Sequence, residues 1–107
     1  MKKANLALFI NQLQQQIPLL HEQYQVKSLG LFGSYVRQEQ RLDSDLDVLV
    51  TFHKPIGLFK FMELENYLTD ILGVKVDLVM EKGLKPRIGQ QILAEVVRID
   101  DSRTHLH

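Results

Sequence analysis

Acidic residues interrupt two short apolar segments that otherwise have the composition of buried β-strands. Asp45 and Asp47 stand at the start of segment 46–52, the clearest predicted strand in the chain, and Asp77 lies inside segment 74–80. Side chains at positions i and i+2 of a strand point to the same face of a sheet, so the first two carboxylates project together. If the two strands are neighbours, all three carboxylates converge on one patch. The placement of three carboxylates on two apolar strands constrains the fold more than any other feature of the sequence.

The three aspartates have a structural interpretation and a functional one. A turn followed by an exposed strand end explains Asp45 and Asp47 equally well, since Asp43-Ser44 just upstream has turn chemistry. Asp77 is harder to explain in this way, because an unpaired buried carboxylate is costly. A self-repelling cluster suits Mg²⁺, which prefers oxygen ligands and is commonly held by one or two carboxylates together with substrate phosphates. Two such ions, about 3.5–4 Å apart, stabilise the entering and leaving oxygens of an in-line displacement.

Helical and extended segments alternate along the chain. Pro18 should end or kink the first helix, Ser34 is expected to cap the second, and Gly73 should end the third. The predicted order is helix 4–20, strand 26–32, a short helix over 35–39, strand 46–52, helix 58–72, strand 74–80, a helix over 88–96, an edge strand over 96–99 and a polar tail over about 100–107. The predicted fold class is therefore α/β (α+β), a small sheet covered by helices in one domain spanning residues 1–107.

The overall composition limits the classes of function. A chain of 107 residues fits one domain with a modest core. Thirteen Lys and Arg balance thirteen Asp and Glu, whereas a protein that binds nucleic acid through its phosphates usually carries a basic excess, so direct stable nucleic-acid binding is not expected. The absence of cysteine excludes disulfides and thiolate metal sites, and no apolar stretch is long enough to span a membrane. These features favour a cytoplasmic protein without membrane attachment.

A second candidate site lies where the strand over 26–32 ends in Gly33-Ser34. Free backbone N–H groups, the Ser34 hydroxyl and the positive end of the following helix form a ready site for phosphate oxygens, and glycine lets a ligand approach the backbone closely. An ordinary Gly-Ser turn explains the pair as well. Arg37 lies on the same helix face as Ser34, where it either contacts bound phosphates or pairs with one of the aspartates.

Other polar and aromatic residues have ordinary structural explanations. Tyr35 lies beside the phosphate turn, where it lines the nucleotide pocket or simply packs. Segment 59–64, with two phenylalanines and a methionine, is interpreted as core, and the cations within 82–87 as a solvated loop. The four histidines share no ligand spacing, so none is assigned to a metal.

Taken together, the two candidate sites resemble a known signature. Gly33-Ser34 followed by Asp45-Leu46-Asp47 is similar to the motif of the DNA polymerase β-like nucleotidyltransferase superfamily. The surrounding strings, residues 31–37 and 44–50, resemble its minimal bacterial and archaeal branch, and the resemblance covers roughly residues 5–99. Asp77 falls where that family carries its third carboxylate. One departure is Gln38, at a position where this branch often has glycine.

The resemblance implies a nucleotidyltransferase fold with a small mixed β-sheet flanked by helices. It implies that Gly33 and Ser34 hold the triphosphate, with Arg37 as a further candidate ligand of the nucleotide. Asp77 is also expected to help activate the acceptor hydroxyl. The implied cofactor is Mg²⁺, as two ions, and the implied donor substrate is ATP. The catalytic and metal-binding residues implied by the resemblance are the three aspartates, Asp45, Asp47 and Asp77.

In the minimal branch, the domain is often the antitoxin encoded beside a small helical toxin of the HEPN ribonuclease class. Such antitoxins can adenylylate (AMPylate) a tyrosine of the toxin with ATP. The resemblance therefore implies a protein adenylyltransferase that neutralises a HEPN-type toxin from the adjacent gene. Two alternatives remain. A binding antitoxin that masks its partner sterically would not need three aspartates, and a small-molecule transferase of the aminoglycoside type generally needs an additional substrate-binding domain.

Overall fold

The computed structural model describes residues 6–99 of the chain. Residues 1–5 and the predicted polar tail over 100–107 lie outside the described residues. Helices and strands alternate along the described part, as the apolar patterning predicts. The elements are α1 (Leu6–Tyr24), β1 (Val26–Phe32), α2 (Ser34–Arg37), β2 (Leu46–Phe52), α3 (Leu58–Leu72), β3 (Val76–Met80), the 3₁₀ turn η1 (Glu81–Gly83), α4 (Pro86–Glu95) and β4 (Val97–Ile99).

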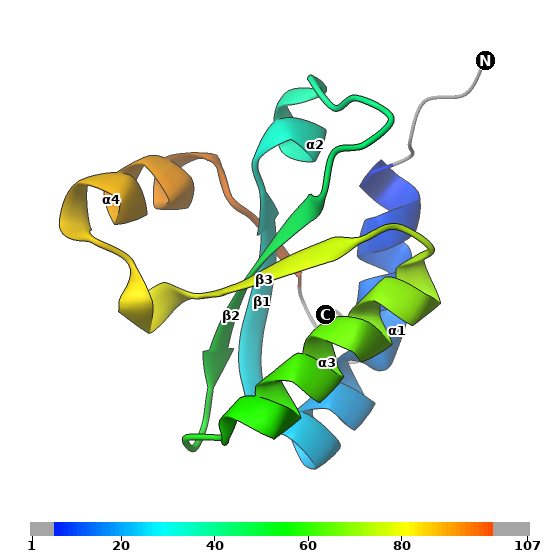
Figure 1. The fold of residues 1–107 in the computed structure, drawn as a ribbon, viewed down its shortest axis with the longest axis vertical. Helices are drawn as coiled ribbons and strands as arrows, with labels where there is room; N and C mark the ends of the chain where they lie inside the picture. The colour runs from blue at the N-terminus through cyan, green and yellow to red at the C-terminus, as the bar shows by residue number, and fades with distance from the viewer. Residues whose placement is uncertain (1–5, 100–107) are drawn as a thin grey trace, which may run out of the picture.

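The four strands form one mixed sheet in the order β3-β2-β1-β4. β1 pairs antiparallel with both β2 and β4, whereas β2 and β3 are parallel. Parallel neighbours need a crossover connection, which α3 supplies. Figure 1 shows α1 and α3 together on one side of the strands and α4 on the other side. The predicted fold class, a small mixed sheet flanked by helices, is confirmed.

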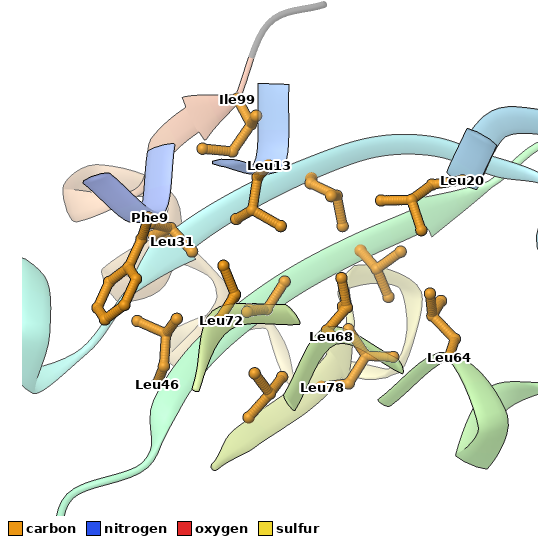
Figure 2. Packing of buried hydrophobic residues seen from close by; sticks show 14 of the residues in the cluster. Phe9, Leu13, Leu20, Leu31, Leu46, Leu64, Leu68, Leu72, Leu78 and Ile99 are labelled. Carbon is orange, nitrogen blue, oxygen red and sulfur yellow. The ribbon is translucent and has the colours of Figure 1, made fainter. Parts of the chain in front are cut away.

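The core lies between the sheet and the two long helices (Figure 2). Alternation along β2 directs Leu46, Val48 and Val50 into it, and each is at most 1% exposed. The apolar stripes of α1 and α3 cover these strand residues, and Leu13 and Leu68 are fully buried there. Burial of one such side chain stabilises the fold by about 1.5–3 kcal/mol, so this layer fixes which face of the sheet is left open.

Two predictions about helix ends differ from the structure. Of the two effects predicted for Pro18, an end or a kink, the end is wrong, since α1 continues to Tyr24 with Pro18 inside it. The last turns bury Leu20 and Tyr24 against the sheet, and this burial offsets the cost of the missing N–H, which is of the order of 3 kcal/mol. Ser34 is not the N-cap of α2; it is the first helical residue, Gly33 is the cap, and among the described side chains none caps this helix.

Most remaining boundaries agree with the prediction to within two residues. Gly73 ends α3 in the left-handed conformation, with φ of 74°, as predicted.

One assignment to the core is wrong in part: Leu64 is fully buried, but Phe59 is 86% exposed and Met62 is 47% exposed. Those two residues lie on the outer side of α3, whose narrow buried stripe is formed by every fourth residue from Leu64. Within residues 6–99, no helix is long and apolar enough to cross a membrane.

Candidate active site

The carboxylates of β2 and β3 meet on the open face of the sheet. Asp47 and Asp77 are direct partners in the parallel register of the two strands. Their sequence neighbours on those strands, Leu46 and Leu78 among them, are buried in the core. Because successive strand residues alternate between faces, both carboxylates point away from the core and toward the same side. The structure therefore brings together two of the predicted residues through strand pairing alone.

Asp45 lies just before β2, close enough for its charge to act on Asp47. Burial is the largest cause that raises the pKa of Asp47 to about 6, followed by the charges of Asp77 and Asp45 and a hydrogen bond with Asp77. The charge of Arg37 opposes this shift. The charges of Asp77 and Asp45 therefore both act on Asp47, after burial as the larger cause of its raised pKa.

Gly33 directly adjoins this cluster. Phe32, the last residue of β1, pairs with Asp47 across the antiparallel ladder, which places the following glycine beside the Asp47 side chain. A Cβ atom on Gly33 would overlap Oδ2 of Asp47. The backbone also has φ of 85° and ψ of −156° here, a conformation that side chains disfavour. Only glycine satisfies both conditions without a shift of the carboxylate.

The turn after β1 continues into a helix of four residues. The carbonyl oxygen of Gly33 accepts hydrogen bonds from the N–H groups of Val36 and Arg37, which fixes the turn. Tyr35 is buried, its ring meets that of Phe9 edge-on at 5.7 Å, and its hydroxyl donates to the carbonyl oxygen of Ser44 at 3.5 Å. Tyr35 is therefore a packing residue, and it ties the turn to the segment that leads into the aspartates.

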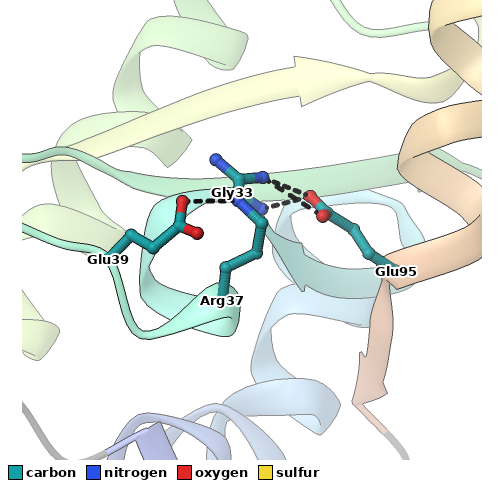
Figure 3. A network of polar contacts seen from close by, with 4 residues as sticks. All are labelled: Gly33, Arg37, Glu39 and Glu95. Atoms are coloured by element: carbon teal, nitrogen blue, oxygen red, sulfur yellow. Dashed lines mark hydrogen bonds and ion pairs between the residues drawn. The ribbon is translucent and has the colours of Figure 1, made fainter.

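Arg37 pairs with two glutamates. The sequence suggests a contact with bound phosphates or a pair with one of the aspartates, and neither interpretation includes a glutamate. Its Nε donates to Glu39 at 3.0 Å, and its Nη1 donates to both carboxylate oxygens of Glu95 at 3.1 Å (Figure 3). Glu95 also accepts a hydrogen bond from the backbone N–H of Gly33 at 2.7 Å. Sequence reasoning missed Glu95, because a single glutamate at the end of a predicted helix carries no signal of a contact sixty residues away.

The carboxylates fit a divalent cation in chemistry, although within residues 6–99 no group of three or more His, Cys, Asp or Glu side chains is arranged to hold one. The observation that favours a cation is the pairing of Asp47 with Asp77 in register on one face. A bound cation would offset the repulsion between them, which after burial is the next cause that raises the pKa of Asp47. His21 and His53 contact each other, with 3.2 Å between Nδ1 and Nε2, away from this cluster. Among the described residues, these two histidines therefore form a pair and not a group of three metal ligands.

A cavity of about 430 Å³ lies at the opposite end of β2 from the aspartates. Its lining includes Lys27, Thr51, His53, Lys54, Met80 and Lys82, and none of the predicted site residues. The candidate active site is therefore an open patch on the sheet face and lies outside this cavity. An open patch leaves room for a large second substrate.

Comparison with known proteins decides the family. The model of the nucleotidyltransferase domain family matches residues 13–99. The chain belongs to the nucleotidyltransferase family. The protein adenylyltransferase MntA of Thermococcus cleftensis is 50% identical to this nucleotidyltransferase over 80 residues, which cover 75% of the chain and 81% of that protein.

Solved structures show the same nucleotidyltransferase fold. A crystal structure of a toxin–antitoxin with AMP-PNP has a TM-score of 0.68 at 26% identity, covering 84% of this chain and 71% of that one. A tri-AMPylated Shewanella oneidensis HEPN toxin in complex with MNT antitoxin has a TM-score of 0.64 at 23% identity, covering 91% and 73%. The second likeness bears on the fold alone.

Alanine at Gly33 should destabilise the nucleotidyltransferase, whereas alanine at Gly57 should not. The new Cβ at Gly33 meets Asp47 and forces a side chain into a backbone with φ of 85°, which we expect to lower the free energy of unfolding by about 1–3 kcal/mol. A Cβ at Gly57 meets no atom within 4 Å, so its effect should stay within about 0.5 kcal/mol. Urea unfolding measures both. Equal losses in the two variants would contradict the close packing described for Gly33.

Asparagine at position 47 should stabilise the metal-free nucleotidyltransferase at neutral pH. The pKa of folded Asp47 is about 6 against a usual 3.8, so the folded state binds this proton more tightly than the unfolded chain. The stability linked to the proton is complete below about pH 4 and is lost as the pH rises through about 6. We therefore expect Asp47→Asn to gain about 1 kcal/mol at about pH 7.5, allowing for screening of a half-exposed group, and nothing at about pH 4.

Thermal unfolding at the two pH values measures this difference, since about 1 kcal/mol shifts the midpoint by roughly 4–8 °C in a domain of this size. Asp70→Asn is the matched control, because Asp70 is an exposed carboxylate on α3. At both pH values, Asp70→Asn should change the free energy of unfolding by no more than about 0.5 kcal/mol. A gain for Asp47→Asn that is equal at both pH values would argue against repulsion and burial as its cause.

Proposed function

We propose that this nucleotidyltransferase is a protein adenylyltransferase that acts as a single domain and uses Mg²⁺ and ATP to transfer AMP to a hydroxyl group of a partner protein. The observation that carries the proposal is the in-register pair Asp47 and Asp77 on the open sheet face, directly beside Gly33. The half-exposed carboxylate of Asp47, the exposed carboxylate of Asp77 and the glycine turn therefore lie within one small patch. This arrangement supports phosphoryl-type chemistry, in which positioning and charge stabilisation do most of the work.

The roles of the residues follow from their places in the patch. Gly33 and Ser34 would hold the triphosphate through backbone N–H groups and the hydroxyl, with Arg37 as a further cation for it. Glycine at position 33 is the feature that lets Asp47 lie directly against the turn, because a Cβ atom there would overlap its Oδ2. The nucleotide would thus lie between the turn and the carboxylates.

Asp45, Asp47 and Asp77 would hold the Mg²⁺ ions. Bound there, the metal would neutralise charge on the phosphates during displacement. Burial and the charges of Asp77 and Asp45 raise the pKa of Asp47, and a bound metal would counter both by favouring the ionised carboxylate. The repulsion present without a metal therefore supports a strong linkage between metal and nucleotide binding.

Asp77 is the exposed member of the pair, so it would be the one within reach of an incoming acceptor. In the proposed transfer, the acceptor hydroxyl oxygen attacks the α-phosphorus of ATP, the bond to the bridging oxygen breaks, and pyrophosphate leaves. Asp77 would take the hydroxyl proton, as a carboxylate held next to the attacking oxygen can do. The products are AMP joined to the acceptor and pyrophosphate.

A protein acceptor is favoured by the open site and by the relatives. Asp77 is exposed and the cavity described above does not enclose the carboxylates, so the acceptor itself would have to exclude water from the reacting groups. The Thermococcus cleftensis relative is a protein adenylyltransferase, and a structural neighbour is a toxin–antitoxin with AMP-PNP. We therefore propose a HEPN-type toxin from the adjacent gene as the partner, with a tyrosine as acceptor and the cytoplasm, where ATP is available, as the location.

Steric masking of the toxin without transfer is the second candidate function. The specific observation in its favour is the exposed apolar surface at the start of α3, where Leu58, Phe59 and Met62 are uncovered. A masking protein would, however, gain nothing from a self-repelling carboxylate pair. A small-molecule acceptor fits less well, since the cavity that could enclose one lies at the other end of β2.

MgATP should raise the thermal stability far more than ATP does in the presence of a chelator. Ligand at about 100 times its dissociation constant stabilises the folded state by roughly 2.7 kcal/mol, and the carboxylates can contribute only when a cation bridges them to the phosphates. Thermal unfolding with MgATP, with ATP and EDTA, and with Mg²⁺ alone measures this linkage. Equal midpoints with and without the metal would count against the proposed site.

AMP transfer should depend on each of the three aspartates. We expect intact-mass spectrometry of the partner, incubated with the chain and MgATP, to show one or more added AMP units. Asparagine at Asp45, Asp47 or Asp77 should lower the transfer rate by at least about a hundredfold with the fold intact, because each removes charge that the displacement requires. Asp70→Asn should transfer at the wild-type rate. Full neutralisation of an unmodified partner, by wild type and variants alike, would favour steric masking instead.

A further inference from the structure

Glu95 provides an anion within the nucleotide site. Its Oε2 accepts the N–H of Gly33 at 2.7 Å, and both its carboxylate oxygens lie 3.1 Å from Nη1 of Arg37 (Figure 3). These are the same two donors that the proposed function assigns to the triphosphate. A carboxylate oxygen and a phosphate oxygen have similar hydrogen-bonding preferences, so the two groups compete for the same positions. Both are negatively charged, so a phosphate that bonds to Gly33 N–H and Arg37 Nη1 would repel Glu95 from these same donors.

The contact is better sheltered than the other ion pair of Arg37. The side chain of Glu95 is 26% exposed, whereas that of Glu39 is 64% exposed. Exposed ion pairs contribute little, and a partly buried charge that accepts a backbone N–H contributes more. Of the two glutamates, Glu95 is therefore the one whose removal would change the free energy of the turn.

Glu95 is also the last residue of α4, a helix that the core does not hold. All residues of α4 are described and none of them is buried, and the helix contributes no side chain to the core cluster or to the partly buried layer around it. Its contact with the turn after β1 runs through Glu95. An element with so little buried surface opens at low free-energy cost, so a change at Glu95 extends to the whole helix.

We propose that Glu95 is an internal competitor of the nucleotide, which the triphosphate displaces from Gly33 and Arg37, and that this displacement releases the C-terminal end of α4 from the turn. Glu95 thereby determines the affinity of the site for ATP. The inference rests on the proposed function only in assigning the turn to the triphosphate. According to this inference, the position of α4 depends on whether nucleotide is bound.

Calorimetric titration with MgATP tests the competition. Glu95→Gln keeps the shape of the side chain and removes its charge, so we expect the dissociation constant to fall about tenfold. Glu39→Gln is the matched control, since Glu39 pairs with Arg37 but not with Gly33; its dissociation constant should stay within about twofold. Glu95→Asp, a second variant with a shorter reach, should also bind more tightly than wild type. Unchanged or weaker binding by both Glu95 variants would overturn the proposal and make Glu95 a positioning residue for Arg37.

Hydrogen–deuterium exchange tests the release of α4. Saturating MgATP should increase amide exchange over residues 86–95 in the wild type, and Glu95→Gln should show the increase before any nucleotide is added. No change over these residues in wild type with bound MgATP would overturn the release. Tight binding by Glu95→Gln without AMP transfer to any partner would count against the proposed function and leave this inference standing. Absence of MgATP binding in wild type and variants would overturn both.

Discussion

The parallel pairing of β2 with β3 is the constraint on which the site depends. It sets Asp47 beside Asp77 on the open face, where their charges oppose each other and burial adds to the cost of ionisation. The opposite face of the same strands offsets this cost, since Leu46, Val48 and Leu78 lie in the core. A shift of either strand by one residue would exchange the two faces, so core packing and site geometry are fixed by a single register.

The parts of the fold that follow local patterning could be predicted from the sequence. The apolar composition of β2 and β3, each interrupted by one aspartate, indicates the two strands, and the alternation of side chains along a strand then gives the face that carries the carboxylates. The structure confirms that these strands are neighbours. The roles of Asp45, Asp47, Asp77, Gly33 and Ser34 in metal and nucleotide binding stay predictions, which rest on the resemblance and on the geometry of the patch.

The features that could not be predicted depend on contacts distant in sequence. Helix α1 runs past Pro18 because the sheet covers its last turns, and no local propensity contains that information. The stretch around Phe59 has a core-like composition, yet only the direction of α3 over the sheet decides which of its side chains are covered. The contacts of Glu95 with Gly33 and Arg37 likewise need the complete fold, since β1 and α4 meet only after the intervening strands are in place.

The strand order leaves β3 and β4 as the two edges of the sheet, with five and three residues. Open edges are templates for association between chains, and short or charged edge strands reduce that hazard. β4 is too short to template a long ladder. On β3, the N–H groups of Val76 and Leu78 already donate to side chains of α3, to Thr69 Oγ1 at 3.0 Å and Glu65 Oε2 at 2.8 Å. A second copy that paired its own β3 here would also bring another Asp77 close to the existing carboxylates. The side chains of α3 and the charge of Asp77 thus both disfavour edge-to-edge pairing at β3.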